Sequence, residues 1–137
     1  GQGSGPREEV GDVLYLRGVL SAMVGIEGIR AAQERFGKGK QMTGEQVRWG
    51  LENLSLTREK LDALGFAGVM QPVMTTCDDH AGAWTARIHT WDGKKWGYSS
   101  DWINADKDLI WPLVKSQAER YAADKKITAR TDADCKS

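Results

Sequence analysis

Residues 77–82 read Cys-Asp-Asp-His-Ala-Gly, and residues 91–96 read Trp-Asp-Gly-Lys-Lys-Trp. The residues between these stretches alternate between apolar and polar side chains, a period of two that predicts a half-buried strand with its apolar side chains inward: Trp84, Thr85, Ala86, Arg87, Ile88 and His89. Asp92-Gly93 is a strong signal for a hairpin turn, after which residues 94–99 return as a second strand. We therefore predict a β-hairpin over residues 84–99.

Upstream, apolar residues recur at helical spacing on more than one stripe and predict a helix over residues 12–36 that needs cover on several sides. Gly18, Gly25 and Gly28 weaken this helix intrinsically and mark positions where another element approaches closely. Glycines at 37 and 39 end it. The apolar residues are Val13, Leu16, Val19, Leu20, Met23, Val24, Ile26 and Ile29.

Two short amphipathic helices follow. Thr43 and Gln46 form a capping box, which predicts a helix over residues 44–54. Thr57 is the N-cap of a second helix, over 57–64, and Gly65 ends it.

A last helix is predicted over residues 107–123, beginning after Asp106 and interrupted or restarted at Pro112. Its inner face comprises Ile110, Val114, Ala118 and Tyr121. Residues 1–9 read as a loop and 125–137 as a polar tail. The order of helices, hairpin and helix is a local α+β pattern.

The composition excludes some classes of function. Lys plus Arg equals Asp plus Glu, at 19 each. This balance argues against nucleic-acid binding and gives no reason to expect an anionic membrane as a partner. Six tryptophans are many for 137 residues; they indicate core packing or, alternatively, a stacking platform for a sugar or an aromatic solute.

The Cys77–His80 stretch contains residue types found at metal and catalytic sites. A structural zinc site needs four ligands, usually in paired short spacings, and no second pair is present. Motifs of phosphate loops, dinucleotide folds and serine hydrolases are missing from the sequence. We therefore expect no metal, no cofactor and no catalytic residue, and keep a small enzyme using Cys77 and His80 as a minor alternative.

Taken together, four segments resemble the C-terminal portion of type I periplasmic solute-binding proteins of the branched-chain amino-acid ABC transporter class. They are Tyr15–Ile29, Glu45–Leu54, Asp79-His80-Ala81-Gly82 and Trp91-Asp92-Gly93. The resemblance implies an α/β fold of which this chain is a C-terminal fragment. Its parts would be a helical part of a lobe (10–65), an extended segment with the hairpin (66–104), a C-terminal helix (105–124) and the tail.

The function implied by the resemblance is the substrate-binding component of an ABC-type uptake system for a small amino acid, a carboxylate or an aromatic solute. Such a protein is periplasmic, and its partners are the solute and a membrane permease. The resemblance places Tyr15 and Arg17 at the ligand. An even cysteine count in an exported protein further implies a disulfide between Cys77 and Cys135.

Two further expectations concern an alternative function and self-association. A ligand-sensing regulatory or interaction module is the alternative function. The unpaired apolar helix faces predict a homodimer, or association with the rest of a parent chain. In a dimer, Leu20, Met23 and Val24 would be buried between chains.

Overall fold

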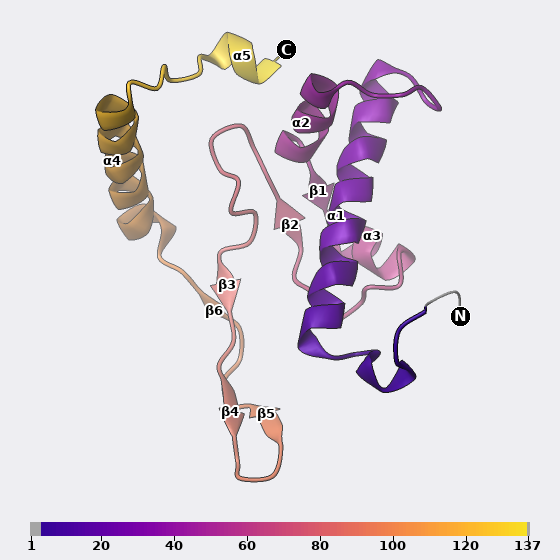
Figure 1. Cartoon of the computed structure of the whole chain (residues 1–137). Coiled ribbons are helices and arrows are strands. Elements are labelled where there is room, and N and C mark those ends of the chain that lie inside the picture. The colour runs from indigo at the N-terminus through magenta and orange to yellow at the C-terminus, as the bar shows by residue number, and fades with distance from the viewer. Residues whose placement is uncertain (1–3, 137) are drawn as a thin grey trace. The chain divides into compact units, whose positions relative to one another are not determined.

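The computed structural model of this protein describes residues 4–136 (Figure 1). The chain divides into two compact units. Unit 1 comprises the residues up to Ser55 together with Thr75–His80, and unit 2 comprises Leu56–Met74 and the residues from Ala81 onward. Among the residues that the structure describes, no helix is both long and apolar enough to cross a bilayer.

Unit 1 is built on two packed helices, α1 (Val13–Phe36) and α2 (Gly44–Glu52), preceded by a short 3-10 helix, η1 (Arg7–Glu9). The predicted capping box is present: Thr43 Oγ1 accepts from the Gln46 amide at 3.3 Å, and Gln46 Oε1 accepts from the Thr43 amide at 3.0 Å. The two helices predicted over residues 12–36 and 44–54 both form, and the capping box sets where α2 begins.

The α1–α2 contact depends on two glycines. A Cβ added at Gly28 would meet the side chain of Leu51, and one added at Gly50 would lie 2.0 Å from the carbonyl oxygen of Gly28. Farther along the contact, the rings of Phe36 and Trp49 pack edge to face with their centroids 5.5 Å apart. The helices thus approach closely enough at Gly28 and Gly50 for backbone to meet backbone.

Unit 2 contains short strands and the remaining helices. Thr57 Oγ1 accepts from the Lys60 amide, so it is the N-cap of α3 as predicted, and Gly65 follows the helix with a positive φ of 81°. β1 (Ser55–Leu56) has one residue in each unit. The elements of unit 2 are α3 (Arg58–Ala63), β2 (Val73–Met74), β3 (Thr85–Ala86), β4 (His89–Trp91), β5 (Trp96–Tyr98), β6 (Ile103–Asn104), α4 (Lys107–Lys125) and α5 (Asp132–Lys136).

The predicted hairpin is present as two short antiparallel ladders. β4 pairs with β5 around the Asp92-Gly93 turn, with Trp91 opposite Trp96 and His89 opposite Tyr98. β3 pairs with β6 farther from the turn, with Thr85 opposite Asn104. The hairpin therefore extends beyond residue 99, the predicted end of its second strand.

The side chains that face inward on the first hairpin strand differ from those predicted. Ile88 is 54% exposed and Ala86 is also exposed, whereas Thr85 and Arg87 are half-buried. The cause is the packing of Arg87, whose guanidinium carbon lies 3.6 Å from the ring centroid of Tyr98. A cation over an aromatic face buries the long arginine stem on the side that the alternation assigns to solvent.

Helix α4 also departs from two expectations. It continues through Pro112 without interruption, so the predicted break is wrong. A proline removes one backbone hydrogen bond, and on an exposed helix water can replace that bond. None of the described residues of α4 is buried, and Tyr121 of the predicted inner face is 60% exposed.

Met23 does not fit the predicted dimer seam. It is 7% exposed within the single chain, so its side chain is already covered. Leu20 and Val24 are half-buried. Self-association itself stays a prediction, but Met23 is not a surface residue through which it would occur.

Two predicted terminal segments lie partly outside the described residues. The loop over 1–9 includes residues 1–3, and the tail over 125–137 includes residue 137. Within the described part of the predicted loop, η1 (Arg7–Glu9) forms a short 3-10 helix. Within the described part of the tail, α5 forms where no helix was predicted.

Candidate functional site

The site residues predicted from the sequence do not come together in a pocket. Tyr15 is 47% exposed and Arg17 is exposed, both in the first turns of α1. Neither lines either of the two pockets described below. Their proposed contact with a ligand stays a prediction.

Both cysteines, Cys77 and Cys135, are disulfide-bonded, so the predicted disulfide is present. A disulfide sulfur is not a thiolate, and the thiolate is the nucleophilic form of cysteine. In this oxidised form, Cys77 therefore has no thiolate with which to serve the minor Cys77–His80 enzyme alternative.

The acidic residues beside Cys77 are held in a turn. The Asp79 amide donates to Thr76 Oγ1 at 3.0 Å, and the Thr76 amide donates to the Asp79 carbonyl at 2.9 Å. His80 Nε2 lies 3.5 Å from Oε1 of Glu52, a buried carboxylate. No group of three or more metal-ligating side chains was found among the described residues.

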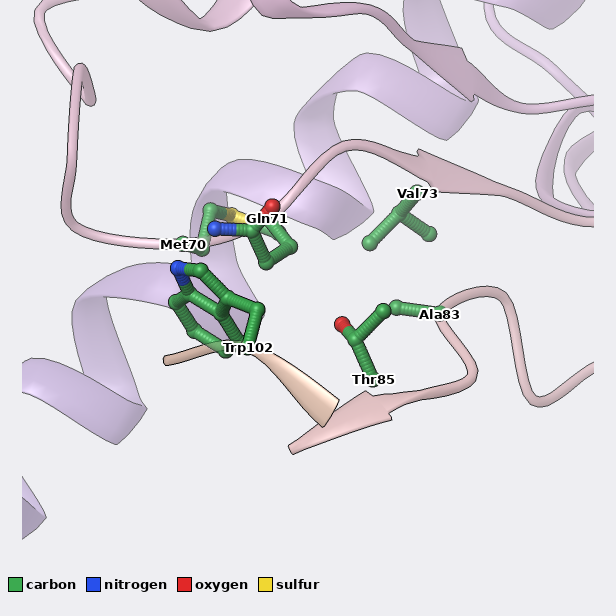
Figure 2. Close-up of a pocket in the computed structure, with 6 residues that line it drawn as sticks. All are labelled: Met70, Gln71, Val73, Ala83, Thr85 and Trp102. Atoms are coloured by element: carbon green, nitrogen blue, oxygen red, sulfur yellow. The ribbon is translucent and has the colours of Figure 1, made fainter. Parts of the chain in front are cut away.

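A pocket with a volume of about 200 Å³ lies in unit 2 (Figure 2). Its walls come from the segment before and within β2, from β3 and its approach, and from the residue before β6. The lining residues are Met70, Gln71, Val73, Ala83, Thr85 and Trp102.

The pairing of β3 with β6 explains why three of these residues meet. Thr85 lies opposite Asn104, and side chains two residues apart on a strand share a face. Trp102 and Ala83 are therefore on the same face of the ladder as Thr85. The segment 70–73 covers this face, and in Figure 2 Val73 lies across from Ala83 and Thr85.

One polar atom of the pocket wall lacks a partner. Thr85 Oγ1 is buried and accepts or donates no hydrogen bond among the described residues. Figure 2 shows this hydroxyl directed toward Trp102. The hydroxyl has almost no accessible surface, so in this structure a ligand atom in the pocket does not reach it.

The indole of Trp102 is held from outside the pocket lining. The guanidinium carbon of Arg87 lies 5.1 Å from the Trp102 ring centroid and also packs on Tyr98. Arg87 thus positions the ring that forms the aromatic wall. Sequence reasoning missed this site because it treated Thr85 and Arg87 as solvent-facing and assigned no element to the part of the extended segment that precedes the hairpin.

A second depression of about 280 Å³ lies along unit 1 and is lined by Arg30, Gln33, Glu34 and Lys38. These side chains come from α1 and the turn after it, and Gln33 Nε2 donates to the carbonyl of Lys40. Its lining is polar and long-chained, whereas the pocket in unit 2 has mostly apolar walls. The unit 2 pocket is therefore the better candidate for a small-molecule site.

Comparisons with known proteins give one informative similarity. No protein-family model and no curated protein matches the chain. A solved crystal structure described as an ABC transporter permease from the Pseudomonas fluorescens group matches with a TM-score of 0.84 and 40% sequence identity. The match covers 92% of this chain and 30% of that chain.

This similarity corrects the resemblance inferred from the four short motifs. The matching structure is described as a permease and not as a periplasmic solute-binding protein, so the assignment to the type I binding proteins is wrong. The chain is similar in sequence and fold to about a third of a protein described as part of an ABC transporter.

Proposed function

We propose that this chain belongs to a component of an ABC-type uptake system. The observation that carries the proposal is the 40% identity over 92% of the chain to the structure described as an ABC transporter permease. Because one fold hosts many functions, the sequence identity supports the proposal more strongly than the shared fold does. The role proposed is transport, without a chemical reaction on the solute.

The partners under this proposal are the other components of the transporter and a small solute. A small amino acid, a carboxylate and an aromatic compound are the solute classes to test. The disulfide of Cys77 and Cys135 supports an oxidising compartment, such as the periplasm, as the location.

Uptake measurements test the proposal directly. Cells lacking the gene are compared with cells in which it is restored, using radiolabelled solutes from each of the three classes. We expect loss of ATP-dependent uptake of at least one solute class and recovery on complementation, with uptake through an unrelated transporter unchanged as the control. Equal uptake of every solute by the two strains would contradict the proposal.

A physical association test complements the uptake measurement. The intact protein is affinity-purified after chemical cross-linking in cells, and bound proteins are identified by mass spectrometry. We expect an ABC-type ATPase among them. Its absence, together with unchanged uptake, would remove the support for a transporter role.

A further inference from the structure

We propose that the end of the hairpin formed by β4, β5 and the turn between them binds the surface of an anionic lipid bilayer. In this arrangement Trp91 and Trp96 lie at the level of the lipid headgroups, and the turn lysines, Lys94 and Lys95, contact the headgroup phosphates. The inference concerns this hairpin surface alone and does not rest on the proposed transport function. A vesicle-binding assay tests it, so its failure is separate from a failure in the uptake assay.

One face of the β4–β5 ladder is aromatic. His89 lies opposite Tyr98 and Trp91 lies opposite Trp96, and residues directly opposite each other on an antiparallel ladder share a face. Residues two apart on one strand also share a face, so all four rings lie on the same side of the ladder. The two residues of the ladder on the other side are not aromatic. The pairing register therefore gathers the rings into a single surface.

The rings of this surface are exposed to solvent. Trp91 is 50% exposed, Trp96 60% and Tyr98 63%, and His89 is exposed as well. Figure 1 shows β4 and β5 at the turn end of the hairpin, beyond β3 and β6. Exposed apolar residues that are grouped in one patch mark an interaction surface, whereas the same residues scattered singly are normal. The aromatic face of β4 and β5 is therefore a candidate interaction surface.

The rings pack against one another, which disfavours a planar ligand. The His89 ring stacks on that of Tyr98 with centroids 4.6 Å apart, and on that of Trp96 with centroids 5.5 Å apart. The guanidinium carbon of Arg87 lies 3.6 Å from the Tyr98 centroid. Neighbouring side chains therefore cover ring faces of His89 and Tyr98, and ring faces are what a nucleobase or a sugar stacks on. The arrangement suits an extended partner surface better than a stacked ligand.

The charge at this end of the hairpin is positive. Residues 87–98 contain three cationic side chains (Arg87, Lys94 and Lys95) and one anionic side chain (Asp92), which gives three minus one, a net charge of +2 with His89 neutral. The whole chain has a formal net charge of +0. Both lysines are exposed. The balanced composition of the chain therefore conceals a surface that is basic and aromatic.

An anionic bilayer surface complements both properties. Tryptophan and tyrosine concentrate at membrane interfaces because one end of each ring is apolar and the other is polar. Lysine side chains place their apolar stems against the interface and their ammonium groups at the phosphates. A neutral bilayer offers no partner for the charge of Lys94 and Lys95, and a purely polar acidic partner leaves the indoles of Trp91 and Trp96 exposed. The combination therefore favours an anionic lipid surface.

The test measures sedimentation of the purified protein with vesicles of phosphatidylglycerol and phosphatidylcholine in equal parts. We expect saturable binding that weakens as the salt concentration is raised, and much weaker binding to vesicles of phosphatidylcholine alone, because the attraction to the lysines is electrostatic. Trp91→Ala and Trp96→Ala should each weaken binding about tenfold, the effect of leaving about 55 Å² of apolar surface in water.

A double variant isolates the charge of the turn. Lys94→Gln combined with Lys95→Gln should weaken binding to the anionic vesicles about 25-fold, or about fivefold per lysine. Glutamine retains the backbone amides that donate to the Asp92 carboxylate at 2.8 and 2.9 Å, so the turn is preserved. Lys38→Gln combined with Lys40→Gln is the matched control, because it removes the same charge from the exposed turn after α1 and should leave binding unchanged.

Circular dichroism checks that each variant is folded. If the tryptophan variants fail to fold, the comparison of the two double lysine variants decides alone. The proposal is overturned if the protein does not sediment with the anionic vesicles, if it binds phosphatidylcholine vesicles equally well, or if the double variant at Lys94 and Lys95 binds as tightly as the control variant.

Discussion

Replacing Gly50 by alanine should destabilise unit 1, although alanine is the better helix former. Gly50 is buried in α2, and a Cβ built there lies 2.0 Å from the carbonyl oxygen of Gly28 and 3.0 Å from the amide nitrogen of Ala32. Both contacts are with backbone of α1, which cannot rotate away as a side chain does. The helices must separate or tilt to admit one methyl group.

The size of the effect follows from the contact distance. Carbon and carbonyl oxygen normally approach to about 3.3 Å, so the backbones must part by roughly 1.3 Å at this point. Overpacking of this kind costs about 1–3 kcal/mol, and alanine recovers up to about 1 kcal/mol in helix propensity. We expect Gly50→Ala to lower the free energy of unfolding by up to about 2 kcal/mol.

Gly25→Ala is the matched control, because Gly25 lies in the interior of α1 and an added Cβ meets nothing within 4 Å. It should raise the free energy of unfolding by up to about 1 kcal/mol. Urea denaturation followed by far-ultraviolet circular dichroism measures both variants against the unchanged protein. If Gly50→Ala proves as stable as Gly25→Ala, the helices do not cross as closely as the structure places them, and the reasoning fails.

Three further predictions concern the disulfide, a helix cap and the hairpin turn. Replacing Cys77 and Cys135 together by serine should lower the melting temperature, because the bridge closes a loop of about 58 residues and such a loop contributes about 4 kcal/mol on the chain-entropy model; a melting temperature equal to that of the oxidised protein would contradict this. Thr43→Ala should cost about 1 kcal/mol in urea denaturation through loss of the capping box, whereas Thr43→Ser should cost less. Backbone amides of Lys95 and Lys94 donate to the Asp92 carboxylate and lower its pKa. The turn is therefore fully stabilised above the ordinary pKa of aspartate and loses that stabilisation as pH falls through the lowered value. The backbone amide chemical shifts of Lys94 and Lys95, followed by nuclear magnetic resonance as pH is lowered, should report this loss. Asp92→Asn should abolish the pH-dependent change.

Local signals in the sequence predicted where α2 and α3 begin and where the hairpin turns. The Thr43 capping box, the Thr57 cap and the Asp92-Gly93 turn each involve residues within four positions of one another, so the sequence contains all the partners. The role of Gly28 in a close approach was also predicted, whereas the same prediction for Gly18 and Gly25 is wrong, because a Cβ added at either meets nothing within 4 Å. Gly50 was not singled out, because its partner lies in another helix and spacing along one helix does not reveal which face meets that partner.

The pocket could not be predicted for a related reason. Its walls come from segments around residues 70, 84 and 102, and only the β3–β6 pairing brings the last two together. One signal was present: Tyr98 and Trp102 follow the turn at positions where a hairpin places them near Arg87. Aromatic residues across from an arginine would have indicated that the polar face of this strand is covered.

The same packing determines which side chains of the first hairpin strand face inward and which of them line the pocket. A shift of one residue in register moves every side chain of a strand to the opposite face. If Ala86 and Ile88 faced inward as the alternation predicted, Thr85 would point away from Trp102 and no hydroxyl would line the cavity. The packing of Arg87 on Tyr98 and Trp102 selects the observed face. Arg87→Ala should therefore destabilise the hairpin through loss of its packing on Tyr98 and Trp102, by about 1 kcal/mol in urea denaturation. Arg87→Lys, which retains the charge but lacks the planar group that stacks on the rings, should recover only part of that stability, and an Arg87→Ala variant as stable as the unchanged protein would contradict this role of Arg87.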